Sequence, residues 1–419
     1  MRFFLPQITP QLRMGMRLPD GLRSLRRRNF RLFFFGQLIS LIGSWMQTTA
    51  QQWLVYRLTG SELSLGVVTF AAFLPVLFLS LGMGVIVDRF ERRRLLVITQ
   101  TWFLLQAAVL AVLTALGVIQ YQHVIILALL AGIGNALDMP ARQSFYVDLV
   151  DRDEMMNAIA LNSSVFNGAR IIGPAIGGVI VALMGEAPAF GLNAISFLAV
   201  IGALLMMRLS PFVPPARSGS GWSELRQGLA YLVADRRVLG LVSMVAAFSV
   251  FGFPYVVLLP VFAGEVLGTG AAGLGALLAA QGVGALASAL GLAFLGERRS
   301  KGRMLFASRA LLPVSVLLLA VSRTPQVSML ALVLGGYTLI NQLAITNTLI
   351  QMVVPDELRG RVLSTYTWAL GGFWPIGSLL TGWMAERLGA PRAVLVVAGV
   401  SAVMALAGWA AFPEARRMD

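Results

Sequence analysis

The stretch Gly84-Val85-Ile86-Val87-Asp88-Arg89-Phe90-Glu91-Arg92-Arg93-Arg94 joins two long apolar segments of the chain. A short turn this rich in arginine is typical of a loop on the cytoplasmic face of a bilayer, because cytoplasmic loops of membrane proteins carry an excess of Arg and Lys. The turn therefore predicts that both flanking segments cross a membrane and that their adjoining ends face the cytoplasm.

The composition of the whole chain agrees with a membrane protein. Of its 419 residues, 57% are hydrophobic and only 12% are charged, which is too much apolar surface for one soluble core. Apolar stretches long enough to cross about 30 Å of hydrocarbon recur along most of the sequence. We therefore expect repeated transmembrane helices and little room for a soluble domain.

The apolar stretches predict twelve spanning helices with both chain ends on the cytoplasmic side. They cover residues 29–56, 64–87, 95–117, 122–147, 157–183, 188–208, 238–262, 270–295, 304–322, 326–352, 362–384 and 391–412. Most of the 33 basic residues then lie in or beside cytoplasmic segments. This bias accounts for the formal charge of +14 without a nucleic-acid partner.

One long polar segment rich in proline and glycine, residues 209–237, divides the predicted spans into two sets of six. The expected domains are an N-terminal cytoplasmic segment 1–28, a six-helix bundle 29–208, a cytoplasmic linker 209–237, a second six-helix bundle 238–412 and a cytoplasmic tail 413–419. The two bundles look like distant copies, because Asp153-Glu154 before Gly173-Pro174 is echoed by Asp356-Glu357 before Trp374-Pro375. Related halves around a midplane cavity are typical of rocking transporters.

The pattern Gly-x3-Asp-Arg-x2-Arg-Arg from Gly84 to Arg93 resembles the loop between helices 2 and 3 of the major facilitator superfamily of secondary transporters. Further segments resemble the bacterial branch related to the enterobactin exporter: Arg28–Arg31, Gly36-Gln37, Trp53–Tyr56, Thr59–Ser61 and Asp138–Gln143. The resemblance implies an all-α polytopic membrane protein of two pseudo-symmetric six-helix halves. It also implies a monomer in the bacterial cytoplasmic (inner) membrane.

The basic turn is the candidate for a conformational latch, formed by Gly84, Asp88, Arg89, Arg92, Arg93 and the acidic partner Asp148. A glycine lets a neighbouring helix approach closely, and a carboxylate is stabilised near the positive N-terminal end of a helix. The resemblance implies that Asp88 faces the start of helix 11, around Arg361–Ser364, and Arg92 or Arg93 is expected to pair with Asp148. The alternative is a turn that only sets topology.

The fifth predicted span carries Gly173, Pro174, Gly177 and Gly178, which resemble the antiporter motif of superfamily exporters. The fuller motif has another glycine four residues before the Gly-Pro pair, where this chain has Ala169 and places Gly168 one position early. Proline bends a helix and glycines allow close packing, so ordinary helix packing is the alternative to an export-specific role.

Three charged residues are predicted deep in the bilayer: Asp138, Arg142 and Arg170. Asp138 and Arg142 are four residues apart on one helical face, and Arg170 lies at a comparable depth on the next span. Charges inside a membrane are costly and are commonly functional, so Asp138 is the candidate for proton binding with Arg142 or Arg170 as its partner. The alternative is a structural salt bridge. Arg309, near the start of its span, is expected to reach the cytoplasmic interface.

The resemblance places helices 1, 4, 7 and 10 around a central cavity. Candidate substrate-contacting residues are Gln37, Ser44, Gln47, Gln51, Asn135, Asn167, Phe248, Phe251, Tyr255, Tyr337, Asn341 and Gln342. Amides beside aromatic rings suit an amphiphilic molecule with planar groups, although the same residues can instead bond and pack between helices.

These features predict a proton-coupled exporter of amphiphilic small molecules, either siderophore-like metabolites or hydrophobic drugs, in contact with membrane lipids. A lysophospholipid flippase of the same fold and a non-transporting receptor or scaffold are the alternatives. We expect neither an enzyme nor a cofactor, because the sequence shows no nucleophile–base pair or phosphate-binding loop. Zero cysteines and a single histidine, His123, also argue against disulfides and a metal site.

Overall fold

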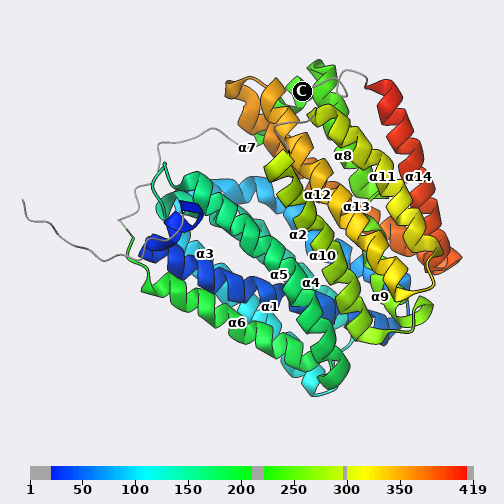
Figure 1. The fold of residues 1–419 in the computed structure, drawn as a ribbon. Helices are drawn as coiled ribbons and strands as arrows, with labels where there is room; N and C mark the ends of the chain where they lie inside the picture. Colours follow the sequence, from blue (N-terminus) through cyan, green and yellow to red (C-terminus); the bar gives the residue numbers. More distant parts are fainter. Residues whose placement is uncertain (1–19, 210–220, 296–299, 413–419) are drawn as a thin grey trace, which may run out of the picture.

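The computed structural model describes residues 20–209, 221–295 and 300–412, and its regular elements in these ranges are all helical (Figure 1). Most of the expected N-terminal segment, the first part of the linker and the tail lie outside the described residues. The elements are η1 (Asp20–Arg26), α1 (Arg28–Thr59), α2 (Glu62–Arg89), α3 (Arg92–Ala115), α4 (Tyr121–Phe145), η2 (Tyr146–Asp148), α5 (Met155–Met184), α6 (Glu186–Met206), α7 (Gly221–Ala234), α8 (Arg236–Phe251), η3 (Pro254–Leu258), α9 (Leu259–Val261), η4 (Phe262–Val266), α10 (Gly270–Leu295), α11 (Lys301–Val321), α12 (Pro325–Val353), α13 (Asp356–Leu388) and α14 (Ala390–Ala411).

Ten helical segments of the described chain are long and apolar enough to cross a membrane. The long helices α1 and α13 are not among them, although they have 32 and 33 residues. Helix α1 carries many Gln, Ser and Thr side chains, and α13 begins with the charged run Asp356–Arg361, which lowers their hydropathy. The all-helical membrane fold is thus confirmed, and the count of twelve spans stays a prediction.

The seventh predicted span, 238–262, is not one continuous helix. Helix α8 ends at Phe251, and the chain continues through η3, α9 and the π-helical turn η4 to Val266. Pro254 and Pro260 cause this irregularity, because proline lacks the backbone N–H that a continuing helix needs. The predicted linker also differs, since part of it forms the 14-residue helix α7, whose Leu232 is buried.

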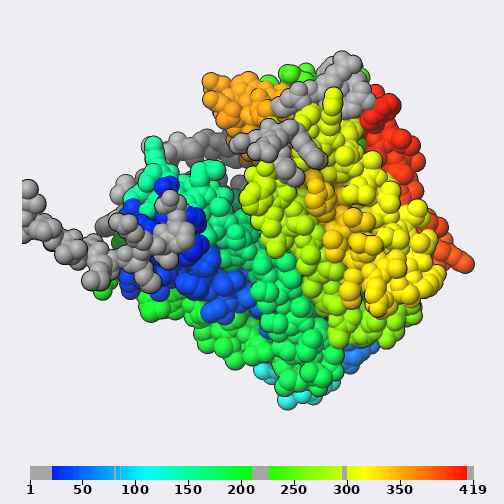
Figure 2. All heavy atoms as spheres, in the orientation of Figure 1, coloured from blue at the N-terminus to red at the C-terminus, as the bar shows by residue number. Residues whose placement is uncertain are grey.

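We call α1–α6 the first helix group and α7–α14 the second helix group. Within the first group, α1 packs on α5 and α6, and α2 packs on α4; within the second, α12 packs on α10 and α11. The groups meet along a seam at which α5 packs on α10 and α2 packs on α13. Figure 2 shows the blue-to-green atoms of the first group and the yellow-to-red atoms of the second group on the two sides of this seam.

The two ends of the bundle differ in charge, and we name them accordingly. The basic end carries Arg27, Arg92 and Arg237 at the starts of α1, α3 and α8, and the opposite, distal end carries Glu62, Glu265 and Glu386. In Figure 1 the two groups converge towards the lower right, at the distal end, while their basic ends lie apart at the left and at the top.

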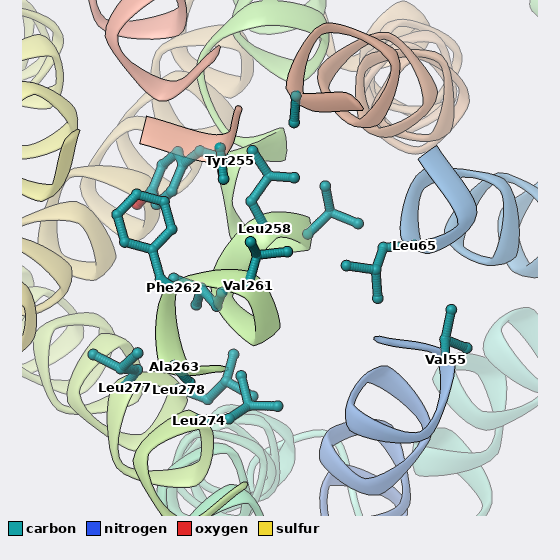
Figure 3. Close-up of a cluster of buried hydrophobic side chains, with 14 of the residues drawn as sticks. Val55, Leu65, Tyr255, Leu258, Val261, Phe262, Ala263, Leu274, Leu277 and Leu278 are labelled. Atoms are coloured by element: carbon teal, nitrogen blue, oxygen red, sulfur yellow. The ribbon is translucent and has the colours of Figure 1, made fainter. Parts of the chain in front are cut away.

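The buried apolar side chains follow the same division. One core at the distal side contains residues of both groups, including Val55 and Leu65 of the first and Phe262 and Leu274 of the second (Figure 3). Towards the basic end there are two separate cores. One contains only first-group residues such as Phe33 and Phe145, with η1 packed beside it, and the other contains only second-group residues. In the described residues, the apolar core that both groups share therefore lies at the distal end, although α2 also packs on α7 of the second group.

Candidate functional site

Polar contacts reinforce the distal seam. The carboxylate of Glu386, near the end of α13, accepts a hydrogen bond of 2.8 Å from the Ser61 hydroxyl and one of 3.1 Å from the Leu63 amide at the start of α2. The Tyr56 hydroxyl of α1 donates to Glu265 of η4 at 3.1 Å. Glu265 and Glu386 were not predicted as site residues, although each lies just beyond the distal end of a predicted span.

The glycines of the fifth span bring two neighbouring helices into close contact with α5. A Cβ added at Gly173 would lie 2.7 Å from the Ile42 carbonyl oxygen, and one at Gly177 would lie 3.0 Å from that of Met46, both in α1. A Cβ added at Gly178 would lie 2.7 Å from the carbonyl oxygen of Ala271 in α10. The Gly173–Gly178 motif, with Pro174 buried inside it, therefore lets α5 pack tightly between α1 and α10 at the seam.

In the basic turn, the acidic partner of Arg92 is Asp148, at 2.9 Å, and the Arg93 side chain donates to the carbonyl of Leu205 at 2.9 Å. Both contacts stay within the first helix group. Arg89 is exposed and Asp88 is half-buried. No hydrogen bond or ion pair joins Asp88 to the described residues around Arg361–Ser364, so the contact with α13 that the resemblance implied is not formed in this conformation.

A second ionic cluster fixes the start of α1 to the start of α5. Arg27 pairs with Glu154 at 2.9 Å and also with Asp151, and the Asn157 side chain donates to the Gly21 carbonyl at 2.7 Å. The hydrogen bond from Arg27 to Glu154 is the main reason that the pKa of this arginine is raised. The basic end of the first group is thus tied together by its own residues.

The deep carboxylate belongs to a buried cluster between α3 and α4. Asp138 is 4% exposed, and one of its oxygens accepts from the Thr99 hydroxyl and the Gln100 amide, each at 2.7 Å. Its other oxygen accepts from Arg142 at 3.0 Å and 2.5 Å. The pairing of Asp138 with Arg142 is the one that the spacing allowed. Thr99 and Gln100 were missed, because two polar residues in an apolar span carry no signal of which helix they face.

Arg170 lies apart from this cluster. Its guanidinium carbon is 5.6 Å from the centre of the Trp45 ring of α1, and the residue is half-buried. The described residues give Arg170 no carboxylate partner; its electrostatic neighbour is Tyr255 of the second group. The ion pair between Asp138 and Arg170 that the sequence suggested is therefore not formed here, and Arg170 stands at the seam as an uncompensated cation.

The candidate cavity residues divide by exposure. Asn135 is exposed, and Ser44, Gln51, Phe251 and Tyr337 are partly exposed. The buried ones are Gln37, Asn167, Phe248, Tyr255, Asn341 and Gln342. Gln47 is bonded to Gln106 of α3 at 3.0 Å and to Asn193 of α6 at 2.7 Å, so it joins helices of the first group. In this conformation, therefore, the exposed and partly exposed residues have surface available for a ligand. They are Asn135, Ser44, Gln51, Phe251 and Tyr337.

Arg309 was expected to reach the cytoplasmic interface, but the structure buries it. It is 2% exposed and ranks among the largest fully buried side chains, so it does not reach an interface with water. Its guanidinium carbon lies 5.3 Å from the centre of the Phe306 ring, and its Nε has no hydrogen-bond partner among the described residues. The expectation assumed that the side chain extends along α11 towards the basic end, whereas the packing of α11 against α12 and α14 encloses it.

A known family accounts for this arrangement over almost the whole chain. The model of the transmembrane secretion effector family matches residues 20–417. The chain belongs to this family. It is therefore a membrane transporter of the major facilitator superfamily and not an enzyme.

Curated relatives of this transporter include efflux pumps and a siderophore transporter. The chain is 29% identical over 376 residues to the staphyloferrin A transporter of Staphylococcus aureus, covering 88% of this chain and 93% of the relative. It is 27% identical over 400 residues to the multidrug efflux pump Tap of Mycolicibacterium fortuitum, covering 93% and 96%. It is 21% identical to the macrolide efflux protein A of Streptococcus pyogenes, covering 86% and 91%. These names do not favour the flippase or receptor alternatives.

Solved structures share the fold of this transporter. A bacterial homologue of the human lysosomal transporter Spinster, in an inward-facing and unoccupied conformation, aligns with a TM-score of 0.72 at 12% identity, covering 95% of this chain and 99% of that one. A peptide transporter of the POT family aligns with a TM-score of 0.75, also at 12% identity, covering 96% and 99%. At this identity the likeness establishes the major facilitator fold alone.

Proposed function

We propose that this transporter exports amphiphilic small molecules across the bacterial cytoplasmic membrane by alternating access, in exchange for protons. The cargo would be siderophore-like metabolites or hydrophobic drugs, and the protein would act as a monomer among membrane lipids. The efflux pumps and the siderophore transporter among the relatives support this cargo class.

One observation carries the alternating-access part of the proposal. The two helix groups share an apolar core at the distal end and keep separate cores at the basic end. A protein packed in this way is closed at one end and able to part at the other. Rocking of the two six-helix bundles predicted from the sequence, 29–208 against 238–412, would exchange the closed end for the open one.

The charge of the two ends supports an orientation. Arginine-rich segments remain on the cytoplasmic side of membranes, so the basic end and both termini would face the cytoplasm. The conformation seen here would then be open to the cytoplasm, ready to load cargo. Release would follow when the distal contacts of Glu386 and Glu265 separate and the basic turn closes.

The buried cluster around Asp138 is our candidate for proton coupling. Its carboxylate is the acceptor for Thr99, Gln100 and Arg142. A proton that binds to Asp138 would remove the charge that holds Arg142, and the packing of α3 against α4 would then change. If the hydrogen bonds of Asp138 change during the transport cycle, proton binding would be linked to the conformation of the first group.

The decisive test is substrate-driven proton flux in liposomes. The purified transporter would be reconstituted with a pH-sensitive dye inside, and a gradient of fluorescent drugs or a siderophore would be imposed. Asp138→Asn is expected to abolish the proton flux while cargo binding persists. Asp356→Asn is the matched control, because Asp356 is an exposed carboxylate that pairs with Arg359 at the start of α13.

Two outcomes would contradict the proposal. Proton flux that survives in Asp138→Asn would assign Asp138 a structural role and move the coupling elsewhere. Failure of the wild-type protein to move protons with any compound, in vesicles where its orientation has been verified, would remove proton-coupled export as the function. Thermal unfolding of each variant shows whether a loss of flux reflects a loss of folded protein.

A further inference from the structure

Arg170 carries a positive charge that no carboxylate compensates among the described residues. Its electrostatic neighbours are the Trp45 ring and the Tyr255 hydroxyl, neither of which is an anion. Arg142, by contrast, is neutralised by Asp138 at 2.5 Å. A cation within a membrane protein is costly unless it is paired, so a position that keeps one unpaired is suited to bind an anion.

The residues around Arg170 come from both helix groups. Trp45 belongs to α1, whereas Tyr255 belongs to η3 and interacts with Gln281 of α10. The backbone of α5 is also in close contact with α10 here, since a Cβ added at Gly282 would lie 3.0 Å from the Arg170 carbonyl oxygen. Helices α5 and α10 lie side by side in Figure 1. Arg170 is therefore located where the groups meet, and a rocking movement of the groups would change its surroundings.

One face of α5 leads from the basic end to Arg170. Its members are Met156, Ile159, Ser163, Phe166 and Arg170. They recur at alternating spacings of three and four, so their side chains project from the same side of the helix. Met156 is 78% exposed, Ile159 is 51% exposed and Phe166 is 44% exposed.

This face is directed towards the second helix group, because the backbone of Arg170 at its deep end lies against Gly282 of α10. Its exposed members nearer the basic end therefore border the space where the two groups have separate cores. The face is mostly apolar and ends at a cation. Phe166 also contacts the Trp45 ring edge to face, with their centres 5.8 Å apart, so two aromatic rings stand beside the charge.

We propose that Arg170 is the anion-recognition residue of the transport site and binds a carboxylate of the cargo. The proposal rests on the proposed transport function and narrows its substrate class to amphiphilic carboxylates. The guanidinium would bind the carboxylate through paired N–H donors, and the planar or apolar body of the cargo would lie along Phe166 and the apolar face of α5.

The experiment compares two ligands, a rhodamine dye with a free carboxylate and the methyl ester of the same dye, which lacks the negative charge and carries one added methyl group. Binding to the purified transporter is followed by dye fluorescence polarisation. Arg170→Gln is expected to weaken binding of the carboxylate dye roughly 10- to 100-fold, the range for a lost charge-assisted contact. Binding of the ester should change less than about twofold. Arg170→Lys keeps the charge and should recover part of the loss.

A loss of equal size for both dyes, or no loss for either, would overturn the assignment. Arg170→Met replaces Arg170→Gln if the glutamine variant does not fold, because it removes the buried charge and leaves no unpaired amide. The transport function is tested separately by export of the ester from proteoliposomes. Export of neither dye by a wild-type protein whose carboxylate binding depends on Arg170 would refute export and leave the anion site standing.

Discussion

The helices α2 and α13 are in contact at the distal end of the bundle and as far along as Leu77 and Gly372, but not at the basic turn. At the distal end, Glu386 accepts hydrogen bonds from Ser61 and Leu63, and Gly66 lets the two backbones approach. At the basic end, a Cβ added at Gly84 would meet nothing within 4 Å, and Asp88 has no bond to the described part of α13.

Each end thus contains a glycine and a carboxylate, but only those at the distal end contact the opposite helix group. A glycine and a carboxylate make contacts at one end, and a glycine and a carboxylate without contacts stand at the other. A glycine without a neighbour gains nothing in this conformation, so Gly84 has a packing role only if α13 or another element approaches it in a different one. The difference between the ends indicates which contacts would break and which would form when the groups rock.

The largest effect is expected from Gly66→Leu. A Cβ at this position would lie 2.7 Å from the Ser378 carbonyl oxygen and 3.1 Å from the Leu379 Cα, which are backbone atoms that cannot move aside. Overpacking of this kind costs about 1–3 kcal/mol, which shifts a two-state equilibrium by roughly 5- to 150-fold. The distal end should therefore open.

Spin labels at Leu116 and Arg323 would measure that opening as an increase in the distance between the groups, and the chain has no native cysteine to remove first. Gly84→Leu is the matched control. A Cβ at this position meets nothing within 4 Å, so the variant should leave the distal distance unchanged. An identical shift in both variants would show that the two ends do not differ in the way described.

A smaller effect is expected from Glu386→Ala. The variant leaves the Ser61 hydroxyl and the Leu63 amide without their acceptor, which costs about 1 kcal/mol at this exposed site and opens the distal end about fivefold. Asp88→Ala, which loses no contact here, should leave the same label distance as it was. Distal opening in Asp88→Ala and none in Glu386→Ala would reverse the assignment of the two ends.

The sequence predicted the fold well because two strong physical signals coincide in it. Apolar length marks the spans, and arginine marks the ends that are predicted to face the cytoplasm, so most helix boundaries agree with the structure to within a few residues. The exception is the segment after α8, where Pro254 and Pro260 interrupt a run that hydropathy alone describes as one helix. A hydropathy value does not indicate that proline lacks the backbone N–H that a continuing helix needs.

The site was predicted only where its partners are close in sequence or carry opposite charges. Asp138 and Arg142 are four residues apart, and Arg92 has the opposite charge to Asp148, 56 residues further along the chain. Glu386 and Ser61 are separated by 325 residues, and their contact depends on how α2 packs on α13. Arg309 was misplaced for a similar reason, since its burial follows from the neighbours of α11 and not from its distance to the helix start.

The smallest effect is expected from Arg92→Gln. This variant breaks the 2.9 Å pair with Asp148, but both residues belong to the first group and are partly exposed. Such pairs contribute about 0.2–1 kcal/mol and are weakened by salt, so the free energy of unfolding should fall slightly and the fall should shrink at high ionic strength. Because the pair does not cross the seam, the distal label distance should stay unchanged. Arg94→Gln is the control, since the acidic partner of Arg94 among the described residues is Glu91 of its own turn. A change in the label distance with Arg92→Gln alone would mean that the basic turn senses the second group even in this conformation, and the two ends would then be coupled through more than α2 and α13.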